Sequence, residues 1–307
     1  MVTESVRITI QTRLLNVNFQ EEFMNRALVL GGGGAVGSAW ESGILCGLAE
    51  ADVDVRESDL IVGTSAGSQV GALVASGESW ERLGARPHEA LPAAGVGPTV
   101  SLPWLIERYG EIQTAAEGPE DWLRRLGAFA RGATTLSAED RRHELGQRLG
   151  LKSWPRRFTA VGIDASTGER LVWTKDSGAD VISAIAASSA LPGVWPCIEV
   201  GGRLAYDGGA YSMENADLAL GHQRVLILCL DVPIATPFPL AEQVEALERS
   251  GSEVRVVRPD ASVRQILHRG GGNLTDPALR GPIADAAEAQ GRALGKELAA
   301  FWNAGRS

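Results

Sequence analysis

Short apolar runs alternate with helical patterns along most of the chain. Residues 27–30 and 60–62 are apolar runs of strand length, and each leads through a glycine-containing turn into a helical pattern. The apolar positions after the first turn recur at helical spacing: Val36, Trp40, Ile44 and Leu48. Gly43 and Gly47 in this pattern predict that the helix packs closely on a sheet. The alternation is typical of βαβ units, so the sequence predicts a three-layer α/β/α fold with a mostly parallel central sheet.

The second half of the chain continues the alternation. Strand-like runs and one helix of small residues are expected at 158–163, 171–173, 181–187 (the helix), 225–230 and 254–257. A Gly201-Gly202 pair between the short runs 198–200 and 203–206 is typical of a two-residue β-hairpin. Near the C-terminus, the apolar residues at helical spacing are Ala287, Leu294, Leu298 and Phe301. We expect this last helix to pack on the core.

The chain is expected to form one main domain. Residues 1–25 are weakly patterned and predict a flexible N-terminal lead, whereas residues 26–307 form the domain itself. Residues 86–150 interrupt the strand pattern and predict a helical insertion. Residues 260–307 predict a C-terminal helical segment.

Two helices are predicted inside the insertion. The first carries four apolar residues at helical spacing: Trp122, Leu123, Leu126 and Phe129. Ser137 and Asp140 form a capping-box pattern for a second helix that ends at Gly150. Prolines at positions 92, 98 and 103 predict irregular chain before these helices. The insertion either packs as ordinary core or covers a substrate cleft, and the pattern leaves both open.

Composition and charge narrow the classes of partner. A hydrophobic content of 44% with 22% charged residues is ordinary for a globular protein. The net charge of −9 argues against binding to nucleic acid and against electrostatic docking on anionic lipid. Any contact with a membrane surface is therefore expected to be transient and driven by apolar groups.

The cysteines and the hydropathy pattern indicate the cellular compartment in which the protein is expected. Cys46, Cys197 and Cys229 are odd in number and lack the spacing of a disulfide framework or a zinc site, so we expect them to be reduced core residues. No metal or other cofactor is expected. The N-terminus has no continuous apolar segment, and no run approaches the roughly 18 apolar residues of a membrane-spanning helix. We expect a cytoplasmic protein.

A G-x-S-x-G pattern at residues 63–67 stands between an apolar strand and a helix. This is the context of a nucleophile elbow, in which Ser65 would occupy a strained turn with its Oγ projecting from the end of the sheet. Gly63 and Gly67 would let the strand and the helix approach closely. The N–H of Ala66, at the positive end of the helix dipole, is a candidate donor to an oxyanion that forms near Ser65.

The glycine loop at residues 31–37 has two interpretations. Gly32, Gly34 and Gly37 satisfy G-x-G-x-x-G, which is typical of dinucleotide binding. The acid that such a site needs would be found among Asp52, Asp54 and Glu57, but all three precede the next strand instead of closing it. Alternatively, the loop's N–H groups form an oxyanion hole that faces Ser65, which explains both glycine turns with one site.

Asp207, Gly208 and Gly209 follow the predicted hairpin. The two glycines free the backbone around Asp207, which stands at the end of a strand, where open α/β sheets place site residues. Asp207 is therefore the candidate partner of Ser65.

Taken in order, the turns at 31–37, 63–67 and 207–209 resemble the motifs of the patatin-like phospholipase family, and the likeness runs from residue 26 to 231. The resemblance implies a patatin-like fold and a lipid acyl hydrolase of phospholipase A or lysophospholipase type. Its catalytic dyad would be Ser65 and Asp207. The family often continues with Asn-Pro, whereas Asn215 is followed here by Ala216.

The resemblance also assigns the glycines. The oxyanion hole would be formed by three consecutive residues of the loop: Gly32, Gly33 and Gly34. The other glycines of the three motifs, which would shape the site, are Gly31, Gly37, Gly63, Gly67, Gly208 and Gly209.

In this mechanism Ser65 attacks an ester carbonyl and Asp207 accepts its proton. The alternatives are a Ser/His/Asp triad that uses His222 or His268, a lipid-binding protein without catalysis, and the dinucleotide-binding protein described above. The sequence leaves open whether the substrate is a phospholipid, a lysophospholipid, a neutral glyceride or a short-chain ester.

Overall fold

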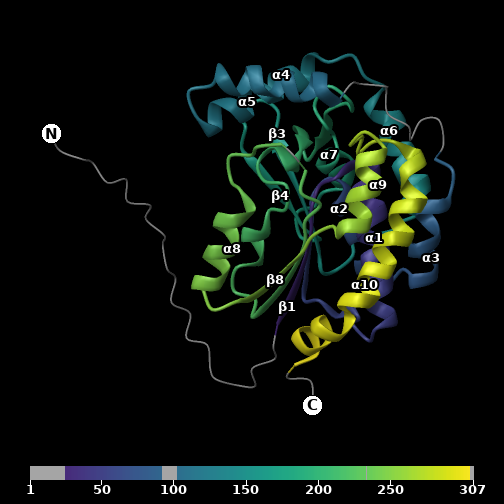
Figure 1. Ribbon diagram of the computed structural model, residues 1–307. Helices are drawn as coiled ribbons and strands as arrows, with labels where there is room; N and C mark the ends of the chain where they lie inside the picture. The colour runs from purple at the N-terminus through teal and green to yellow at the C-terminus, as the bar shows by residue number, and fades with distance from the viewer. Residues whose placement is uncertain (1–24, 92–101, 233, 305–307) are drawn as a thin grey trace.

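The computed structural model describes residues 25–91, 102–232 and 234–304 (Figure 1). The predicted N-terminal lead therefore lies outside the described residues, apart from Asn25. The strands are β1 (Arg26–Leu30), β2 (Leu60–Gly63), β3 (Phe158–Asp164), β4 (Arg170–Trp173), β5 (Ile198–Val200), β6 (Arg203–Asp207), β7 (Arg224–Leu228) and β8 (Glu253–Val257). The helices are α1 (Gly34–Glu50), α2 (Ala66–Ala75), α3 (Trp80–Ala85), α4 (Leu102–Thr114), α5 (Pro119–Gly132), α6 (Ala138–Leu149), α7 (Val181–Ser188), α8 (Leu240–Arg249), α9 (Ala261–Arg269) and α10 (Arg280–Asn303).

The described strands form one mixed sheet in the order β5-β6-β3-β2-β1-β7-β8, with β4 also paired to β3. The five strands β3, β2, β1, β7 and β8 run parallel to one another, whereas β4 and β6 run antiparallel to β3. The predicted hairpin is confirmed, because β5 and β6 pair across Gly201 and Gly202, whose φ angles are 61° and 79°. Both positive φ angles fit the turn that a two-residue hairpin requires.

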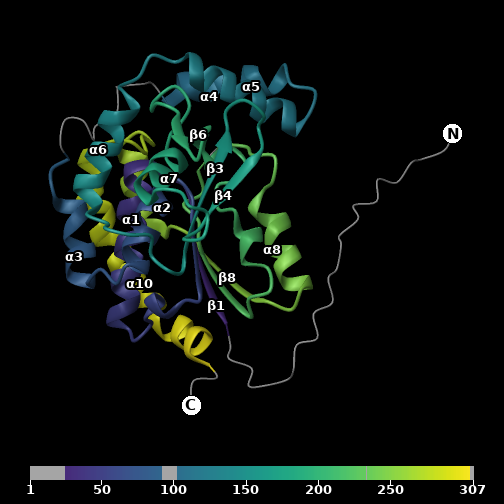
Figure 2. The same cartoon turned by 180° about the vertical axis from the view of Figure 1, so that it is seen from behind.

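Helices cover both faces of this sheet. In Figure 1 α8 lies on one side, and α1, α9 and α10 lie on the other. Figure 2 shows α2 and α7 on the α1 side from behind. Each face has its own hydrophobic core, with Leu28 and Ile61 in the core on the α1 side and Val29 and Val62 in the core on the α8 side. The alternation along β1 and β2 sends successive side chains to opposite faces. The three-layer, mostly parallel fold is thus confirmed.

The glycine face of α1 packs on a helix and not on the sheet. A Cβ atom on Gly43 would overlap the main-chain oxygen of Ala284, and one on Gly47 would overlap that of Glu288, both in α10. Gly291 of α10 approaches α1 equally closely. The expectation that Gly43 and Gly47 face the sheet is therefore wrong, because the C-terminal helix covers α1 from outside and needs small residues on both sides of the contact.

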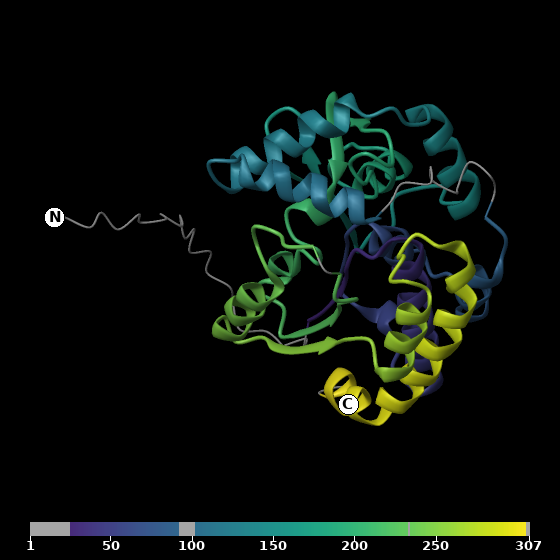
Figure 3. The same cartoon turned by 45° about the horizontal axis from the view of Figure 1, so that its top comes forward.

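The segment between β2 and β3 contains α4, α5 and α6, and α4 and α5 lie side by side across the top of the molecule (Figure 3). The predicted cap is confirmed, since the Ser137 Oγ accepts a hydrogen bond from the Asp140 N–H and Gly150 ends α6 in a left-handed conformation. The sequence predicted irregular chain as far as Pro103, and this prediction is wrong for Leu102 and Pro103. Helix α4 already begins at Leu102, and Pro103 stands in its first turn, where no main-chain N–H is needed. Pro92 and Pro98 lie outside the described residues.

Within the described residues, no helix is both long and apolar enough to serve as a transmembrane segment.

The α1–α10 contact predicts a strong effect of added volume. We expect Gly47→Ala to lower the free energy of unfolding by about 1–3 kcal/mol or more, because its Cβ overlaps main chain that cannot move away without separating the helices. Gly110→Ala is the matched control, since Gly110 in α4 has open space around it and alanine there should stabilise the helix by about 0.5–1 kcal/mol. Urea unfolding of both variants measures the difference, and equal stabilities would contradict this packing.

Candidate active site

Ser65 occupies a strained turn between β2 and α2. Its φ and ψ angles are 53° and −117°, which a non-glycine residue rarely adopts. The turn is closed by tight contacts of its glycines: a Cβ on Gly63 would lie 2.6 Å from the Gly67 oxygen, and a Cβ on Gly67 would overlap the oxygen of Leu30. The sequence G-x-S-x-G therefore describes a turn in which only glycine fits on either side of the serine.

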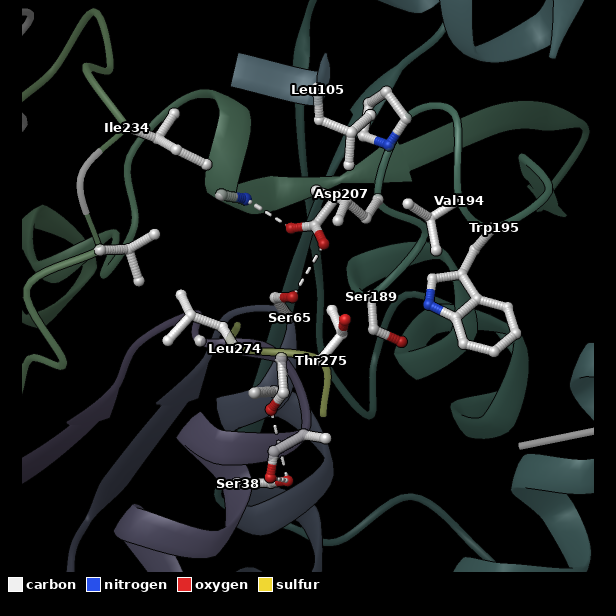
Figure 4. A pocket seen from close by; sticks show the side chains of 18 of the residues that line it. Ser38, Ser65, Leu105, Ser189, Val194, Trp195, Asp207, Ile234, Leu274 and Thr275 are labelled. Atoms are coloured by element: carbon white, nitrogen blue, oxygen red, sulfur yellow. Dashed lines mark hydrogen bonds between the residues drawn. The ribbon is translucent and has the colours of Figure 1, made fainter. Parts of the chain in front are cut away.

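The sheet register brings Asp207 to this turn. Gly63 pairs with Ala160 of β3, and Asp207 pairs with Gly162, two residues further along the same strand. Asp207 is the last residue of β6, which runs antiparallel to β3. The chain therefore approaches the serine turn at Asp207 from the opposite direction to the parallel strands. The Ser65 Oγ donates a hydrogen bond to the Asp207 Oδ2 at 2.8 Å (Figure 4).

Burial makes Asp207 a stronger base than a free aspartate. The residue is buried, and loss of solvation raises its pKa from 3.8 to about 7, although hydrogen bonds from the Gly209 N–H and the Ser65 Oγ act in the opposite direction. The Gly209 N–H donates to Asp207 Oδ1 at 2.8 Å, so each carboxylate oxygen has one fixed partner. A carboxylate with a pKa near neutral pH can accept a proton from a hydroxyl more readily than an ordinary aspartate.

The predicted oxyanion donors differ in whether their N–H groups are already hydrogen-bonded. The Gly32 N–H donates to the Met213 oxygen at 2.8 Å, so it already has an acceptor. The N–H groups of Gly33, Gly34 and Ala66 have no hydrogen-bond acceptor among the described residues. Gly33, Gly34 and Ala66 also line the same cavity as Ser65 and Asp207.

Gly31 opens the glycine loop but does not line the cavity, so its place differs from that of a site residue. Its N–H donates to the Leu228 oxygen at 3.2 Å, which continues the pairing of β1 with β7 beyond Leu30. Its oxygen accepts a hydrogen bond from the Gly67 N–H at 3.0 Å. Both main-chain groups of Gly31 are thus hydrogen-bonded, and the residue joins the loop to the serine turn.

Gly37 also supports the loop from outside the cavity. Its N–H donates to the Gly33 oxygen at 2.7 Å, and its Cα lies 2.8 Å from where a Cβ on Gly33 would stand. The first turn of α1 therefore closes directly against the loop.

Asn215 joins the serine turn to the aspartate turn. Its Nδ2 donates to the Thr64 Oγ1 at 3.1 Å, to the Gly208 oxygen at 3.4 Å and to the Ser212 oxygen at 2.7 Å. The residue is buried, with φ at 53°. In the sequence, Asn215 stands out only because proline does not follow it. Its role was missed because the contact with Thr64 spans 151 residues of chain.

Ser188 of α7 also fixes the serine turn. Its Oγ accepts a hydrogen bond from the Ser65 N–H at 3.1 Å. The small-residue pattern at 181–187 predicted the helix correctly but ended one residue before this serine.

A cavity of about 460 Å³ opens beside Ser65 and Asp207. Much of its wall is apolar and includes residues from α4, α5 and the loop after α7: Leu105, Tyr109, Trp122, Leu126, Val194 and Trp195. Figure 4 shows Ile234 and Leu274 on one side of the Ser65–Asp207 pair, Trp195 on the opposite side and Leu105 above Asp207. The helical insertion therefore supplies part of the cavity wall. No group of three or more metal-binding side chains occurs in the described part of the chain.

All four histidines lie in the described part of the chain, and none lines the cavity: His88, His143, His222 and His268. The Nδ1 of His222 lies 3.1 Å from the Ala219 oxygen, at the start of β7 and hence at the opposite end of that strand from the site. His268 is exposed in α9. The structure thus brings Ser65 and Asp207 together and leaves both candidate triad histidines outside the cavity.

Fold and site together define an α/β protein in which a G-x-S-x-G turn and a buried aspartate meet at one edge of a mostly parallel sheet. The chain belongs to the patatin-like phospholipase family, whose model matches residues 28–220. The match includes all three glycine motifs, and the resemblance read from the sequence is confirmed.

Individual relatives are more distant. An uncharacterized NTE family protein of Mycobacterium tuberculosis is 28% identical over 207 residues, which is 67% of this chain and 30% of that protein. The chain thus spans less than a third of the length of this curated relative. Two solved structures are similar over 89% of the chain: the type III effector protein ExoU (15% identity, TM-score 0.40, 53% of that chain) and VipD from Legionella pneumophila (13% identity, TM-score 0.43, 67% of that chain).

Burial of Asp207 predicts how stability depends on pH. Because its folded-state pKa is raised, folding binds a proton between pH 3.8 and about 7, and the protein loses stability as pH rises through that window. Asp207→Asn removes the buried charge. We expect the stability gained by this substitution, measured by urea unfolding, to be greater at pH 8 than at pH 5 by on the order of 2 kcal/mol.

The buried Glu41 and Glu214 also have raised pKa values, chiefly through loss of solvation. The comparison between Asp207→Asn and the wild type at each pH cancels their contribution. An equal gain at both pH values would contradict the raised pKa of Asp207.

Proposed function

We propose that this protein is a serine hydrolase that cleaves an acyl ester bond of a lipid through a Ser65–Asp207 dyad. The observation that carries the proposal is the 2.8 Å hydrogen bond from the Ser65 Oγ to a buried carboxylate at the wall of a largely apolar cavity. Membership in the patatin-like phospholipase family supports the same reaction.

In the first step the Ser65 Oγ attacks the ester carbonyl while Asp207 accepts its proton. The carbonyl oxygen becomes an oxyanion, and the N–H groups of Gly33, Gly34 and Ala66 are the donors proposed to stabilise it. Gly32 was expected to donate as well, but its N–H is committed to Met213, so we assign it the task of fixing the loop. Collapse of the tetrahedral intermediate expels the alcohol, which takes the proton from Asp207, and leaves an acyl group on Ser65.

In the second step water hydrolyses the acyl-enzyme. Asp207 accepts a proton from the attacking water and returns it to the Ser65 oxygen as the fatty acid leaves. The same carboxyl group thus serves both half-reactions. Its raised pKa suits this use, since a proton carrier works best when its pKa is near the operating pH.

The cavity favours a substrate with an acyl chain. Leu105 and Tyr109 of α4 line it, whereas Trp104 and Ile106 of the same helix are 47% and 40% exposed. A helix with apolar side chains both inside the cavity and on the outer surface is suited to a transient contact with a membrane surface. We therefore propose a phospholipase A or lysophospholipase type of activity, with a lipid surface as the transient partner.

The rival classes fit the structure less well. A triad would need His222 or His268 at the cavity, which neither reaches. A dinucleotide site would need an acid beside the glycine loop, but Asp52, Asp54 and Glu57 all follow the far end of α1, whose 17 residues span about 25 Å. A lipid-binding protein without catalysis has no need of the strained serine turn.

Labelling with a fluorophosphonate tests the proposal directly. We expect the probe to modify Ser65, identified by mapping the labelled peptide. Ser65→Ala and Asp207→Asn should each lower the hydrolysis of a chromogenic acyl ester by roughly 10³-fold or more, because the members of a nucleophilic unit act together. Ser76→Ala and Asp176→Asn, at exposed positions outside the cavity, are the matched controls. Full activity in either dyad variant would refute the assignment.

A further inference from the structure

One wall of the cavity is basic. Arg141 and Arg148 project from α6, seven residues apart and therefore on one face of the helix, and Arg280 is the first residue of α10. All three line the cavity. The chain has a net charge of −9, so three cations around one cavity depart from its overall composition.

Three arginines line the cavity together with two acids, Asp207 and Asp276. Glu144 accepts hydrogen bonds from both arginines of α6, at 2.8 Å from the Arg141 Nη1 and at 2.7 Å from the Arg148 Nε. One carboxylate is therefore shared by two guanidinium groups. Asp276, which also lines the cavity, caps a short turn by accepting from the Ala278 N–H at 2.9 Å.

Arg280 adds a third cation, which is held by main-chain groups. Its two terminal nitrogens donate to the main-chain oxygens of Glu89 and Arg86, at 2.8 and 2.6 Å. Burial and the nearby charge of Arg148 lower the pKa of Arg280, whereas the charge of Glu89 acts to raise it. The guanidinium is thus held in place by neutral groups and keeps its charge available.

Arg141 is buried with incomplete hydrogen bonding. It is 3% exposed, and its guanidinium stacks on the Trp195 ring at 3.7 Å from the ring centre. Its Nε is buried and has no hydrogen-bond partner within the described part of the chain. Loss of solvation lowers the pKa of Arg141 to about 10, although the nearby charge of Glu144 acts to raise it. A buried cationic donor without an acceptor is unfavourable, and the residue that carries it lines the cavity.

Arg148 is tied to the helix that begins directly after the nucleophile. Gln69 follows Ser65 by four residues in α2, about 6 Å along the helix axis. The Arg148 Nη2 donates to the Gln69 Oε1 at 2.7 Å, which ties α6 to this turn. The apolar wall comes from other helices, with Leu105 on α4 and Trp122 on α5. Both walls therefore belong to the cavity that Ser65 lines.

We infer that Arg141, Arg148 and Arg280 bind the phosphate group of the ester substrate, which makes the substrate a phospholipid or lysophospholipid and not a neutral glyceride. The inference rests on the proposed hydrolase function. Guanidinium groups suit phosphate because their planar donors match its oxygens and keep their charge when partly buried. Glu144 holds both guanidinium groups of α6 in position.

The test compares two soluble substrates with the same acyl chain and the same ester bond, 1-octanoylglycerol and 1-octanoylglycerol 3-phosphate. We expect the wild type to have a kcat/KM at least about tenfold higher for the phosphorylated ester, as charge-assisted hydrogen bonds of this kind predict. Arg148→Gln should lower this ratio about tenfold or more. Arg142→Gln removes the same charge from the same helix outside the cavity and should keep the ratio. Arg280→Gln serves if Arg148→Gln does not fold.

The outcomes separate the inference from the hydrolase proposal. Equal kcat/KM for both esters in the wild type, or a ratio unchanged by Arg148→Gln, overturns the phosphate assignment while hydrolysis itself stands. If the wild type cleaves neither ester, the hydrolase proposal fails, and calorimetry on the Ser65→Ala protein decides the binding question. Tighter binding of the phosphorylated ester than of the neutral one supports the inference. Binding of inorganic phosphate with no discrimination between the esters overturns it.

Discussion

The hydrogen bond between the Ser65 hydroxyl and the buried Asp207 carboxylate is the interaction around which the molecule is built. A carboxylate at that depth is unfavourable, and burial raises its pKa to about 7. Surrounding contacts hold the two residues in place. The glycine turns let β2 and α2 close around Ser65, and Asn215 joins the serine turn to the aspartate turn. The strain at Ser65 and the burial of Asp207 are costs in stability that a reactive site explains.

Local sequence predicted those parts of the site whose chemistry requires one residue type. Glycines at 63 and 67 are needed because any side chain would overlap main chain, so the motif was readable without the structure. The hairpin and the end of α6 were predicted for a different reason, since Gly201, Gly202 and Gly150 have positive φ angles that favour glycine. Gly43 and Gly47 were misplaced, since a small-residue face fits a sheet or a helix equally well. The cover by α10 is a contact across some 240 residues, which no local pattern encodes.

The remaining parts of the site depend on tertiary contacts. A run of four glycines does not reveal which N–H groups stay free, and only the fold shows that those of Gly31 and Gly32 are taken by other main-chain oxygens. Asn215 and Ser188 are ordinary polar residues in the sequence, yet they hold the turn of Ser65. The arginines of α6 look like the solvated face of a surface helix until Trp195 and the cavity are seen beside them. The insertion thus supplies walls that its composition alone left undecided between plain packing and a substrate cleft.

Asp207, without any histidine, is the base that we propose for Ser65. The pH dependence of kcat/KM in a protein with all four histidines replaced by glutamine (His88, His143, His222 and His268) tests it most directly, since a histidine titrates near pH 6.5 and would otherwise be confused with this carboxylate. With Asp207 as the base, we expect the variant to retain its activity and its rate to rise with pH through a pKa of about 7. Loss of activity by about a hundredfold, together with loss of that rising limb, would contradict it.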